Sequence, residues 1–228
     1  MKDIIVGIAS LSEREECLKD TIESLYDQSN KIIVTLNNYN SIPDFLKREK
    51  IECILSDNSI GAMGKFMKIK EYKDCYYFSC DDDIIYPDNY ISKTIKKMNE
   101  NGYDIVTYHG SNLNRPITTY FKSKKLVGHF SGNLEEDIEV EIGGTGVMCI
   151  NTEKLNFDIT KEDAKWWKHM VDLFISNESR KKDIQIFLLE HKFNFLKYNE
   201  KMNKKWTIYE TYSKNDISQT NIVKSWRS

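Results

Sequence analysis

The sequence has 228 residues, of which 40% are hydrophobic and 30% charged, enough chain to bury one sizeable core. An aromatic content of 12%, with ten glycines and three prolines, excludes a disordered, collagen-like or linker-rich protein. Thirty-three Lys and Arg residues against thirty-five Asp and Glu give a net charge of -2, so bulk charge supplies no attraction to nucleic acid. We expect one folded domain that holds any anionic ligand at a local site.

No apolar run is long enough to predict a membrane span. The longest runs, such as Ile4 to Ala9, have about six residues, whereas a spanning helix needs roughly eighteen. The first residues lack the small-residue cleavage site of a secretory leader. Five cysteines without a CxxC pair fit reduced, buried thiols better than a disulfide or zinc framework. These features predict a cytoplasmic protein.

Strands and helices alternate over the first 110 residues. The β-branched run Ile4 to Ala9 is typical of a strand buried on both faces, and a helix with Leu18, Ile22 and Leu25 on one side follows it. Further strands are predicted at 31–36, 52–55, 75–80 and 105–108, and helices at 64–72 and about 87–98. This order predicts an α/β fold with a doubly wound, mostly parallel sheet flanked by helices, which binds ligands at the carboxyl ends of its strands.

The second half is less regular. Residues 110–135 show no period, which predicts loops or a small antiparallel element rather than a second domain. Strands are expected at 139–142, 147–150 and 184–189, and one helix over about 163–176. The tail from Asn199 is polar with scattered aromatic residues and lacks a clean amphipathic period. We expect it to pack on the domain or on a second copy in a homo-oligomer; peripheral contact with the inner face of a membrane, through Lys204, Lys205, Trp206, Lys224, Trp226 and Arg227, is the alternative.

Three consecutive aspartates, Asp81, Asp82 and Asp83, directly follow a predicted buried strand. Two carboxylates about 4 Å apart repel by roughly 4 kcal/mol at an effective dielectric near 20, so a divalent cation or hydroxyl donors are expected to offset the charge. If the segment is extended, Asp81 and Asp83 point the same way. Hard oxygen donors of this kind suit Mn²⁺ or Mg²⁺. A solvated acidic loop that caps the next helix is the alternative.

Two features of the second half also favour a site. Three glycines in Gly143-Gly144-Thr145-Gly146 permit a tight turn or a close approach of the backbone to a ligand, with a plain hairpin as the alternative. Asp172 lies among apolar and aromatic residues, where desolvation makes a carboxylate more basic and suits it to act as a general base. An exposed position on the helix would remove that argument. His191 follows a predicted strand and is a candidate metal ligand or an ordinary satisfied histidine.

Taken in order along residues 4 to 196, the motifs resemble those of family 2-like glycosyltransferases with the GT-A fold. They are Ile8-Ala9-Ser10 with Arg14, the run Ile22 to Gln28, Leu36-Asn37-Asn38-Tyr39, Asp57-Asn58 with Gly61, Gly64-Lys65-Phe66, Asp81 to Pro87, His109-Gly110, Gly144-Thr145-Gly146 and His169-Met170-Val171-Asp172.

The resemblance implies transfer of a sugar, with inversion, from a nucleotide-sugar donor, most simply a UDP-sugar, to a hydroxyl of a glycan or lipid-linked glycan. It implies Mn²⁺ or Mg²⁺ as cofactor and a role in a bacterial surface polysaccharide such as capsule or lipopolysaccharide. Residues 1–110 would form the nucleotide-sugar half of a single domain, 111–198 the acceptor and catalytic half, and 199–228 a C-terminal tail.

The resemblance also assigns roles to residues. Asp172 would be the catalytic base, Asp83 would bind the metal with Asp81 and His191 as further candidate ligands, and Asp81 and Asp82 would face the nucleoside and donor sugar. The ammonium of Lys65 would offset diphosphate charge. The other candidates for the substrate pocket are Ser10, Arg14, Asn37, Asp57, Gly144, Thr145, Gly146 and Trp167, the last with a place in the core as its alternative.

Two other functions stay open. A sugar nucleotidyltransferase would share the architecture but needs a glycine-rich phosphate loop after the first strand, and residues 10–14 contain no glycine. A non-catalytic protein that binds a nucleotide sugar or a glycan would keep the binding residues without turnover.

Overall fold

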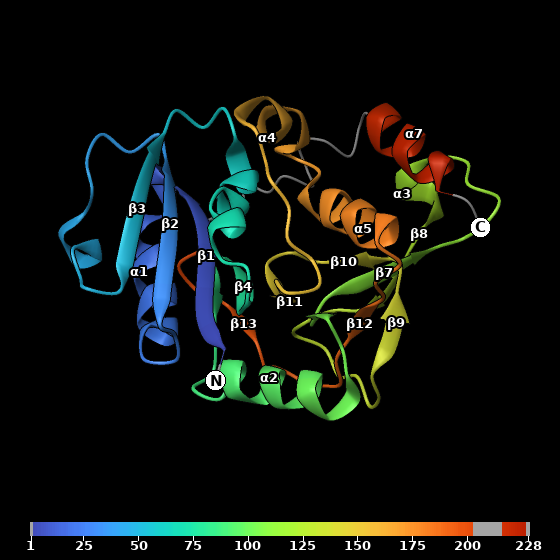
Figure 1. Ribbon diagram of the computed structural model, residues 1–228, viewed down its shortest axis with the longest axis horizontal. Coiled ribbons are helices and arrows are strands. Elements are labelled where there is room, and N and C mark those ends of the chain that lie inside the picture. The colour runs from blue at the N-terminus through green and yellow to red at the C-terminus, as the bar shows by residue number, and fades with distance from the viewer. Residues whose placement is uncertain (1, 203–215, 227–228) are drawn as a thin grey trace.

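A mixed eight-stranded sheet forms the centre of the computed structural model, which describes residues 2–202 and 216–226 (Figure 1). Its strands, in spatial order, are β3 (Ile51–Ser56), β2 (Lys31–Asn37), β1 (Asp3–Leu11), β4 (Cys75–Asp81), β11 (Val147–Asn151), β6 (Ile105–Thr107), β12 (Ile186–Leu188) and β9 (Ile138–Val140). The first four run parallel, as do β6 and β12, while β11 and β9 are antiparallel to their neighbours. The predicted α/β class and mostly parallel sheet are confirmed.

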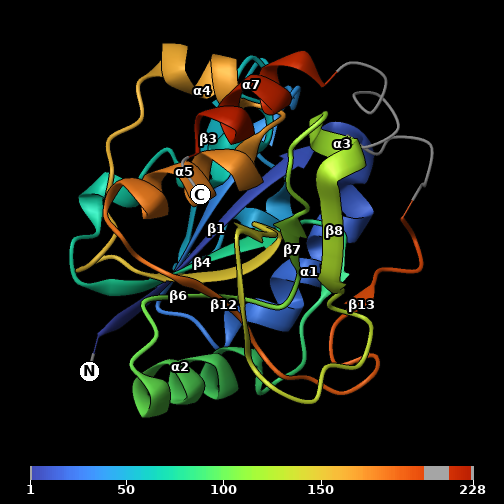
Figure 2. The same cartoon turned by 90° about the vertical axis from the view of Figure 1, so that its right-hand side faces the viewer.

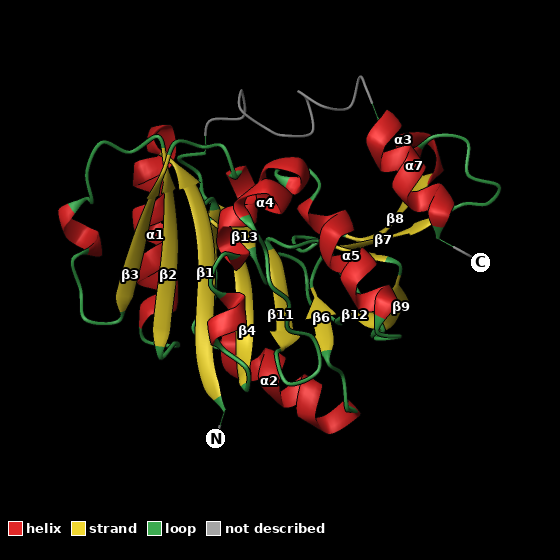
Figure 3. Ribbon diagram, turned by 45° about the horizontal axis from the view of Figure 1, so that its top comes forward, coloured by secondary structure: helices red, strands yellow, loops and turns green. Residues whose placement is uncertain are grey.

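Helices cover both faces of this sheet. The helices α1 (Glu15–Tyr26) and α2 (Tyr90–Asn101) pack on one face, and α5 (Val171–Lys181) packs on the other with the 3₁₀ helix η3 (Gly61–Phe66). Figure 2 shows α2 below the sheet and α5 above it, and Figure 3 shows α4 (Lys161–Trp167) and α5 in front of the strands. In β1, Ile5 belongs to one apolar cluster and Val6 to the other, which is why the run is apolar throughout.

A small antiparallel sheet occupies the predicted irregular region. It consists of β10 (Ile142–Gly143), β7 (Gly110–Leu113) and β8 (Lys124–Gly128). A third apolar cluster joins it to α5, the short helix α3 (Tyr120–Ser123) and α7 (Ile217–Ser225). A separate pair of two-residue strands, β5 (Ile84–Ile85) and β13 (Lys197–Tyr198), links the turn after β4 to the end of the second half.

The prediction of one helix over residues 64–72 is wrong. Two 3₁₀ helices, η3 and η4 (Ile69–Glu71), take its place. The main-chain carbonyl of Lys65 accepts a hydrogen bond from the Tyr77 hydroxyl at 2.6 Å, and that of Gly64 accepts one from Thr35 at 2.9 Å. Side chains of the sheet thus use carbonyls that an α-helix would need for its own hydrogen bonds.

The helix predicted over about residues 163–176 is broken in two. Helix α4 ends at Trp167, and α5 begins at Val171. At the break, the backbone of Lys168 lies so close to Gly61 that a side chain there would approach it to 3.2 Å. The break places Asp172 in the first turn of α5 rather than in the middle of a helix.

Neither the single strand at 139–142 nor the alternative of a plain glycine hairpin is correct. The segment 138–143 divides between β9 in the large sheet and β10 in the small one, and β10 and β11 do not pair with each other. Residues 144–146 carry the chain from one sheet to the other, between β10 and β11.

The described part of the tail packs on the domain. The Trp226 side chain is buried and its indole nitrogen donates to Asn177 of α5 at 3.3 Å. Of the six tail residues considered for membrane contact, Lys204, Lys205, Trp206 and Arg227 lie outside the described residues. No helix within residues 2–202 and 216–226 has the length and apolar character to cross a membrane.

Candidate active site

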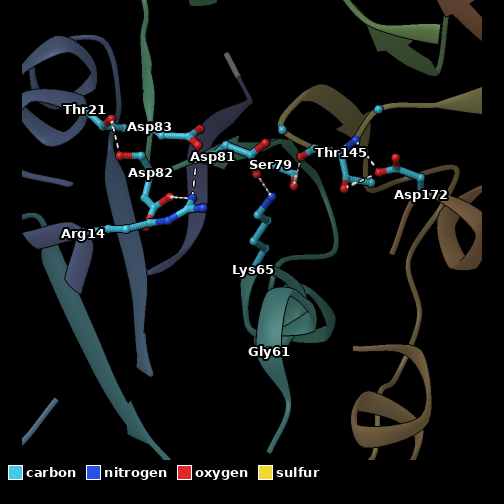
Figure 4. A network of polar contacts seen from close by, with 12 residues as sticks. Arg14, Thr21, Gly61, Lys65, Ser79, Asp81, Asp82, Asp83, Thr145 and Asp172 are labelled. Atoms are coloured by element: carbon cyan, nitrogen blue, oxygen red, sulfur yellow. Dashed lines mark hydrogen bonds and ion pairs between the residues drawn. The ribbon is translucent and has the colours of Figure 1, made fainter. Parts of the chain in front are cut away.

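The acidic triplet lies at the carboxyl end of β4, in the middle of the sheet. Asp81 is the last residue of β4, and Asp82 and Asp83 form the turn before β5. The Thr21 hydroxyl on α1 fixes this turn, because it donates to the main-chain carbonyls of Asp82 at 3.0 Å and Ile84 at 2.9 Å. The chain turns after Asp81, so the segment is not extended and the alternation of side chains along a strand does not apply to Asp82 and Asp83. Asp82 and Asp83 share Arg14, and Asp81 faces Lys65 (Figure 4).

Arg14 neutralises part of the charge of the triplet. Its Nη1 lies 2.9 Å from Asp82 Oδ1 and 3.1 Å from Asp83 Oδ2, and both carboxylates are buried. The second oxygen of Asp82 has no hydrogen bond of ordinary geometry within the described residues, although Ser10 lies near enough to favour the charged form. Burial raises the pKa of both aspartates against the attraction of Arg14, and repulsion by Asp81 and Asp82 helps to raise that of Asp83 to about 7.

Lys65 supplies the second cation. It lies on η3, its side chain is 4% exposed, and its ammonium pairs with Asp81. Burial acts to lower the pKa of Lys65, but attraction by Asp81 and, more weakly, by Asp172 outweighs burial and raises it. The lysine is therefore charged and lies within the fields of two carboxylates from different halves of the chain.

The segment Gly144–Gly146 lies between those two carboxylates. The amide nitrogen and the hydroxyl of Thr145 donate to Asp172 Oδ1 at 2.9 and 2.7 Å. On the other side, a side chain at Gly146 would collide with Asp81 Oδ2. The glycine thus allows the backbone to approach the triplet, as the composition of this segment predicts. Figure 4 shows Asp81 and Lys65 on one side of Thr145 and Asp172 on the other.

A cavity of about 310 Å³ opens between these groups. We group its lining residues under two names. The sheet side comprises Ala62, Lys65, Asp81, Ile84, Gly144, Thr145, Gly146, Val147 and Asp172, and the opposite wall comprises His109, Tyr120, Phe121, Lys124, His129, Phe130, His169, Met170, Val171, Leu173, Tyr198 and Gln219. The two groups meet where Tyr198 pairs with Ile84 and where Gly144 approaches His109. Six of the predicted site residues therefore meet in one cavity: Lys65, Asp81, Asp172 and the three residues of the glycine segment.

The opposite wall holds residues that the sequence analysis did not single out as site residues. Burial lowers the pKa of His109 and His169 to about 4, so both imidazoles are neutral near pH 7. The Tyr198 ring packs edge-on against Phe130, with centroids 4.8 Å apart. Of the residues in this wall, His109, His169, Met170 and Val171 belong to quoted motifs of the resemblance. The aromatic residues come from irregular segments, where no period marks them.

Several predicted pocket residues lie outside this cavity. Ser10 and Asn37 are buried at the ends of β1 and β2, where the Asn37 amide donates to the carbonyl of Gly61 at 3.3 Å. Asp57 is exposed and accepts a hydrogen bond from the amide of Ser59 at 3.0 Å. Arg14 pairs with Asp82 and Asp83 and does not line the cavity. The assignment of these four residues to a nucleotide pocket stays a prediction.

Two further candidates have contacts of their own. Trp167 is half-buried against Phe174, with ring centroids 5.3 Å apart, and does not line the cavity. His191 is buried, and its two ring nitrogens face the carbonyls of Leu189 at 2.7 Å and His129 at 3.0 Å. To bind a metal, His191 would have to leave one of these carbonyls, because a ligating nitrogen carries no proton.

The donor set at the triplet partly fits a divalent cation. Within the described ranges, no group of three or more His, Cys, Asp or Glu residues is arranged to hold a metal ion. However, among the residues that the structure describes, three carboxylates face two cations, Arg14 and Lys65, and the buried Asp82 Oδ2 lacks a hydrogen bond. One or two carboxylates with phosphate oxygens from a substrate are a usual ligand set for Mg²⁺, and this set needs no third protein ligand.

Comparison with known proteins agrees with the fold. Residues 5–162 match the sequence pattern of the family described as glycosyl transferase family 2. Three crystal structures of the S. aureus protein TarS, residues 1–349, resemble the chain. The complex with UDP-GlcNAc has a TM-score of 0.56 at 12% identity, over 92% of this chain and 64% of that one. The complex with UDP has a TM-score of 0.52 at 13% identity, over 85% and 59%.

The third TarS structure has a TM-score of 0.51 at 12% identity, over 85% of this chain and 59% of that one. The chain thus spans about three fifths of the TarS fragment. Identities this low support the fold alone, and they confirm the predicted GT-A-type arrangement. None of the curated proteins matches the sequence significantly.

Proposed function

The chain belongs to glycosyl transferase family 2, and on that premise we propose that it is a metal-dependent, inverting glycosyltransferase. Its donor would be a nucleotide sugar and its acceptor a hydroxyl group of a glycan. The observation that carries the proposal is the position of two carboxylates, Asp81 and Asp172, on either side of Gly144–Gly146 in one cavity. Asp81 lies beside the charged groups expected of a donor site, and Asp172 is positioned to act as a base.

The donor side of the cavity is suited to a diphosphate. The buried ammonium of Lys65 is charged and stands at the carboxyl end of the sheet, where α/β proteins bind nucleotides. A Mn²⁺ or Mg²⁺ ion held by Asp83 and its neighbours would act as a Lewis acid for the departing diphosphate. The TarS complexes with UDP and UDP-GlcNAc support a UDP-sugar as donor.

Asp172 has the geometry of a general base. Thr145 holds Oδ1 through two hydrogen bonds, which fixes the plane of the carboxylate. None of the described residues donates to Oδ2, so this oxygen can accept a proton from a ligand in the cavity. A base within hydrogen-bond reach of the attacking hydroxyl is what the displacement needs.

The reaction would be a single displacement. The acceptor oxygen forms a bond to the anomeric carbon while the bond from that carbon to the diphosphate oxygen breaks, and the hydroxyl proton passes to Asp172 Oδ2. The electron pair of the broken bond leaves with the nucleoside diphosphate. Attack opposite the leaving group inverts the anomeric configuration. The cytoplasmic location, the surface-polysaccharide pathway and the lipid-linked acceptor stay predictions from the sequence.

The decisive experiment measures release of UDP from UDP-sugars by the full chain with Mn²⁺, with and without glycan acceptors. We expect Asp172→Asn to lower acceptor-dependent transfer by about 10² to 10⁴, the usual contribution of a positioned base. UDP affinity, measured by calorimetry, should stay within about twofold because Asp172 does not touch Lys65 or the triplet directly. The matched control is Glu178→Gln, an equally conservative change on the same helix α5.

The same experiment separates the other functions. Wild-type transfer rates in Asp172→Asn would remove Asp172 from the mechanism. A chain that binds UDP-sugars but releases no UDP under any condition would be a non-catalytic binding protein. A nucleotidyltransferase would instead release pyrophosphate from a nucleoside triphosphate and a sugar phosphate. The glycine-free segment of residues 10–14, which ends β1 and forms a 3₁₀ turn, speaks against that reaction.

A further inference from the structure

The opposite wall of the cavity carries a cation, Lys124, for which residues 2–202 and 216–226 supply no ionic partner. Lys124, the first residue of β8, lines the cavity and is half-buried. Within the described part of the chain no carboxylate pairs with it, and its nearest recorded partner is the Tyr120 ring, 5.5 Å from its ammonium. The cations of the sheet side, Lys65 and Arg14, are both paired with aspartates.

Aromatic rings line the same cavity as this lysine. Tyr198 is 47% exposed and packs on the buried ring of Phe130, so one side of the tyrosine ring is supported by the protein and the ring remains accessible. His109 also lines the cavity, and its Nδ1 is buried without a hydrogen-bond partner among the described residues. Rings of this kind bind the apolar faces of sugars, while an unpaired imidazole nitrogen can bond to a hydroxyl group.

The position of this wall connects it with the base. The charge of Lys124 and that of Asp172 both act on His109, with opposite effects on its pKa, and all three residues line the same cavity. A sugar ring between Tyr198 and His109 would lie in the same cavity as Asp172 Oδ2. Lys124 would then meet a substituent of that ring or of the next residue of the glycan.

We propose that this wall is an acceptor subsite for an anionic carbohydrate, in which Lys124 pairs with a carboxylate or phosphate group of the acceptor. The inference rests on the proposed function, because it assumes that the sheet side holds the donor. It adds the chemical class of the acceptor: a sugar that carries a negative charge close to the hydroxyl that is glycosylated. Both uronic acids and phosphorylated sugars have this chemistry.

The test uses three small sugars as probes of the full chain saturated with UDP and Mn²⁺, so that the donor side is blocked. The probes are methyl glucoside, which is neutral, glucuronate, and glucose 6-phosphate, and binding is measured by saturation-transfer NMR titration. We expect wild type to bind at least one anionic sugar about tenfold more tightly than methyl glucoside. Preference for glucuronate or for the phosphate distinguishes the two sources of charge.

Variants identify the residue responsible. Lys124→Met, with Lys124→Gln as a second version should the first fold poorly, should abolish the preference for anionic sugars. Lys125→Met is the matched control, because Lys125 is exposed on the same strand, does not line the cavity, and points to the opposite face. Tyr198→Ala should weaken all three sugars about equally and keep the preference.

Two results would overturn the proposal: equal affinity of wild type for neutral and anionic sugars, including no binding of any of them, or a preference that survives in both Lys124 variants. UDP affinity, measured on the same samples without sugar, reports separately on the donor side. Loss of UDP binding with the anionic preference intact would contradict the proposed function and leave the anionic sugar site standing.

Discussion

The two walls of the cavity differ in charge and in aromatic content. Lys65 and Asp81 on the sheet side belong to a group of five charged residues that also contains Arg14, Asp82 and Asp83 from beside the cavity, and most of the five are buried and paired with one another. The opposite side consists of aromatic rings and neutral imidazoles, and its one lysine is unpaired within the described residues. Charge is concentrated and internally compensated on one wall, and sparse and uncompensated on the other.

This difference indicates which interactions each wall would form with a ligand: ion pairs on the sheet side and ring contacts on the opposite wall. A buried carboxylate that is already paired with a cation loses little electrostatic free energy when a metal ion or a phosphate binds and the ion pairs change partners. The opposite charges stay close together within the site. An aromatic wall offers area and shape, and the single charge of Lys124 selects among ligands. The glycine segment 144–146 belongs to both walls, since Gly146 touches Asp81 and Gly144 touches His109.

Alanine substitutions at these two glycines should therefore separate the walls, and they carry the largest effect expected here. In Gly146→Ala the new methyl group would collide with the Asp81 carboxylate and displace it from Lys65. We expect affinity for UDP in the presence of Mn²⁺ to fall by about tenfold or more, since a charge-assisted pair at a half-buried site is worth on the order of 1–2 kcal/mol.

Gly144→Ala should have the complementary effect. Its methyl group would lie 2.8 Å from the His109 ring, so the ring must shift while Asp81 stays in place. Slow hydrolysis of the donor without acceptor should remain near wild type, and KM for the acceptor should rise. A circular dichroism melt of both variants checks that the fold is kept. Equal losses of UDP affinity in the two variants would contradict the division of the cavity into two walls.

The sheet side should also affect how the free energy of unfolding depends on pH. The pKa of Asp83 rises from 3.8 to about 7 in the folded chain, so the native state binds the proton more tightly than the unfolded state. The free energy of unfolding should accordingly fall as pH rises from about 4 to about 7. Asp83→Asn removes this penalty and leaves two carboxylates for Arg14 and Lys65.

We expect the melting temperature of Asp83→Asn at pH 8, without metal, to exceed that of wild type by about 3 to 6 °C, which corresponds to 1–2 kcal/mol in a chain of this size. Mn²⁺ should stabilise wild type at pH 8 and stabilise the variant less. Asp88→Asn, at an exposed aspartate between β5 and α2, is the control. A variant that melts below wild type at pH 8 would show that the triplet needs all three charges.

The sheet side could be predicted from the sequence because its residues follow regular elements. The apolar strand 75–80 was enough to place Asp81, Asp82 and Asp83 at the carboxyl end of a strand in the sheet, where α/β proteins bind ligands. The turn after Asp81 could not be predicted from the alternation of side chains along a strand, because the turn depends on the Thr21 hydroxyl of α1. The pairing of Asp82 and Asp83 with Arg14 therefore appears only in three dimensions.

The opposite wall could not be predicted, because its parts share no period and come from stretches of sequence that are far apart. His109, the neighbouring residues Tyr120 and Lys124, and Tyr198 come from three such stretches, which the fold brings to one cavity. The break before Asp172 is of the same kind, since it depends on contact between Lys168 and Gly61, far apart along the chain. Helical spacing across residues 163–176 carries no signal of that contact.

The opposite wall should produce a pH dependence of opposite sign, and the effect should be smaller. Burial lowers the pKa of His109 from 6.5 to about 4 in the folded chain, so the unfolded state binds the proton more tightly. Stability from this source should rise as pH increases from about 4 to 6.5, against the trend of Asp83. In wild type the two trends partly cancel over the same interval.

The Asp83→Asn background exposes the histidine contribution alone. There, we expect His109→Phe, which keeps an aromatic ring against Gly144, to raise the melting temperature at pH 5 by about 1 to 3 °C and to leave it nearly unchanged at pH 7.5. His169, with a pKa also lowered to about 4, keeps part of the slope in the variant. If His109→Phe changes stability equally at both pH values, the ring contributes through packing, and its proton has no part in the difference between the two walls.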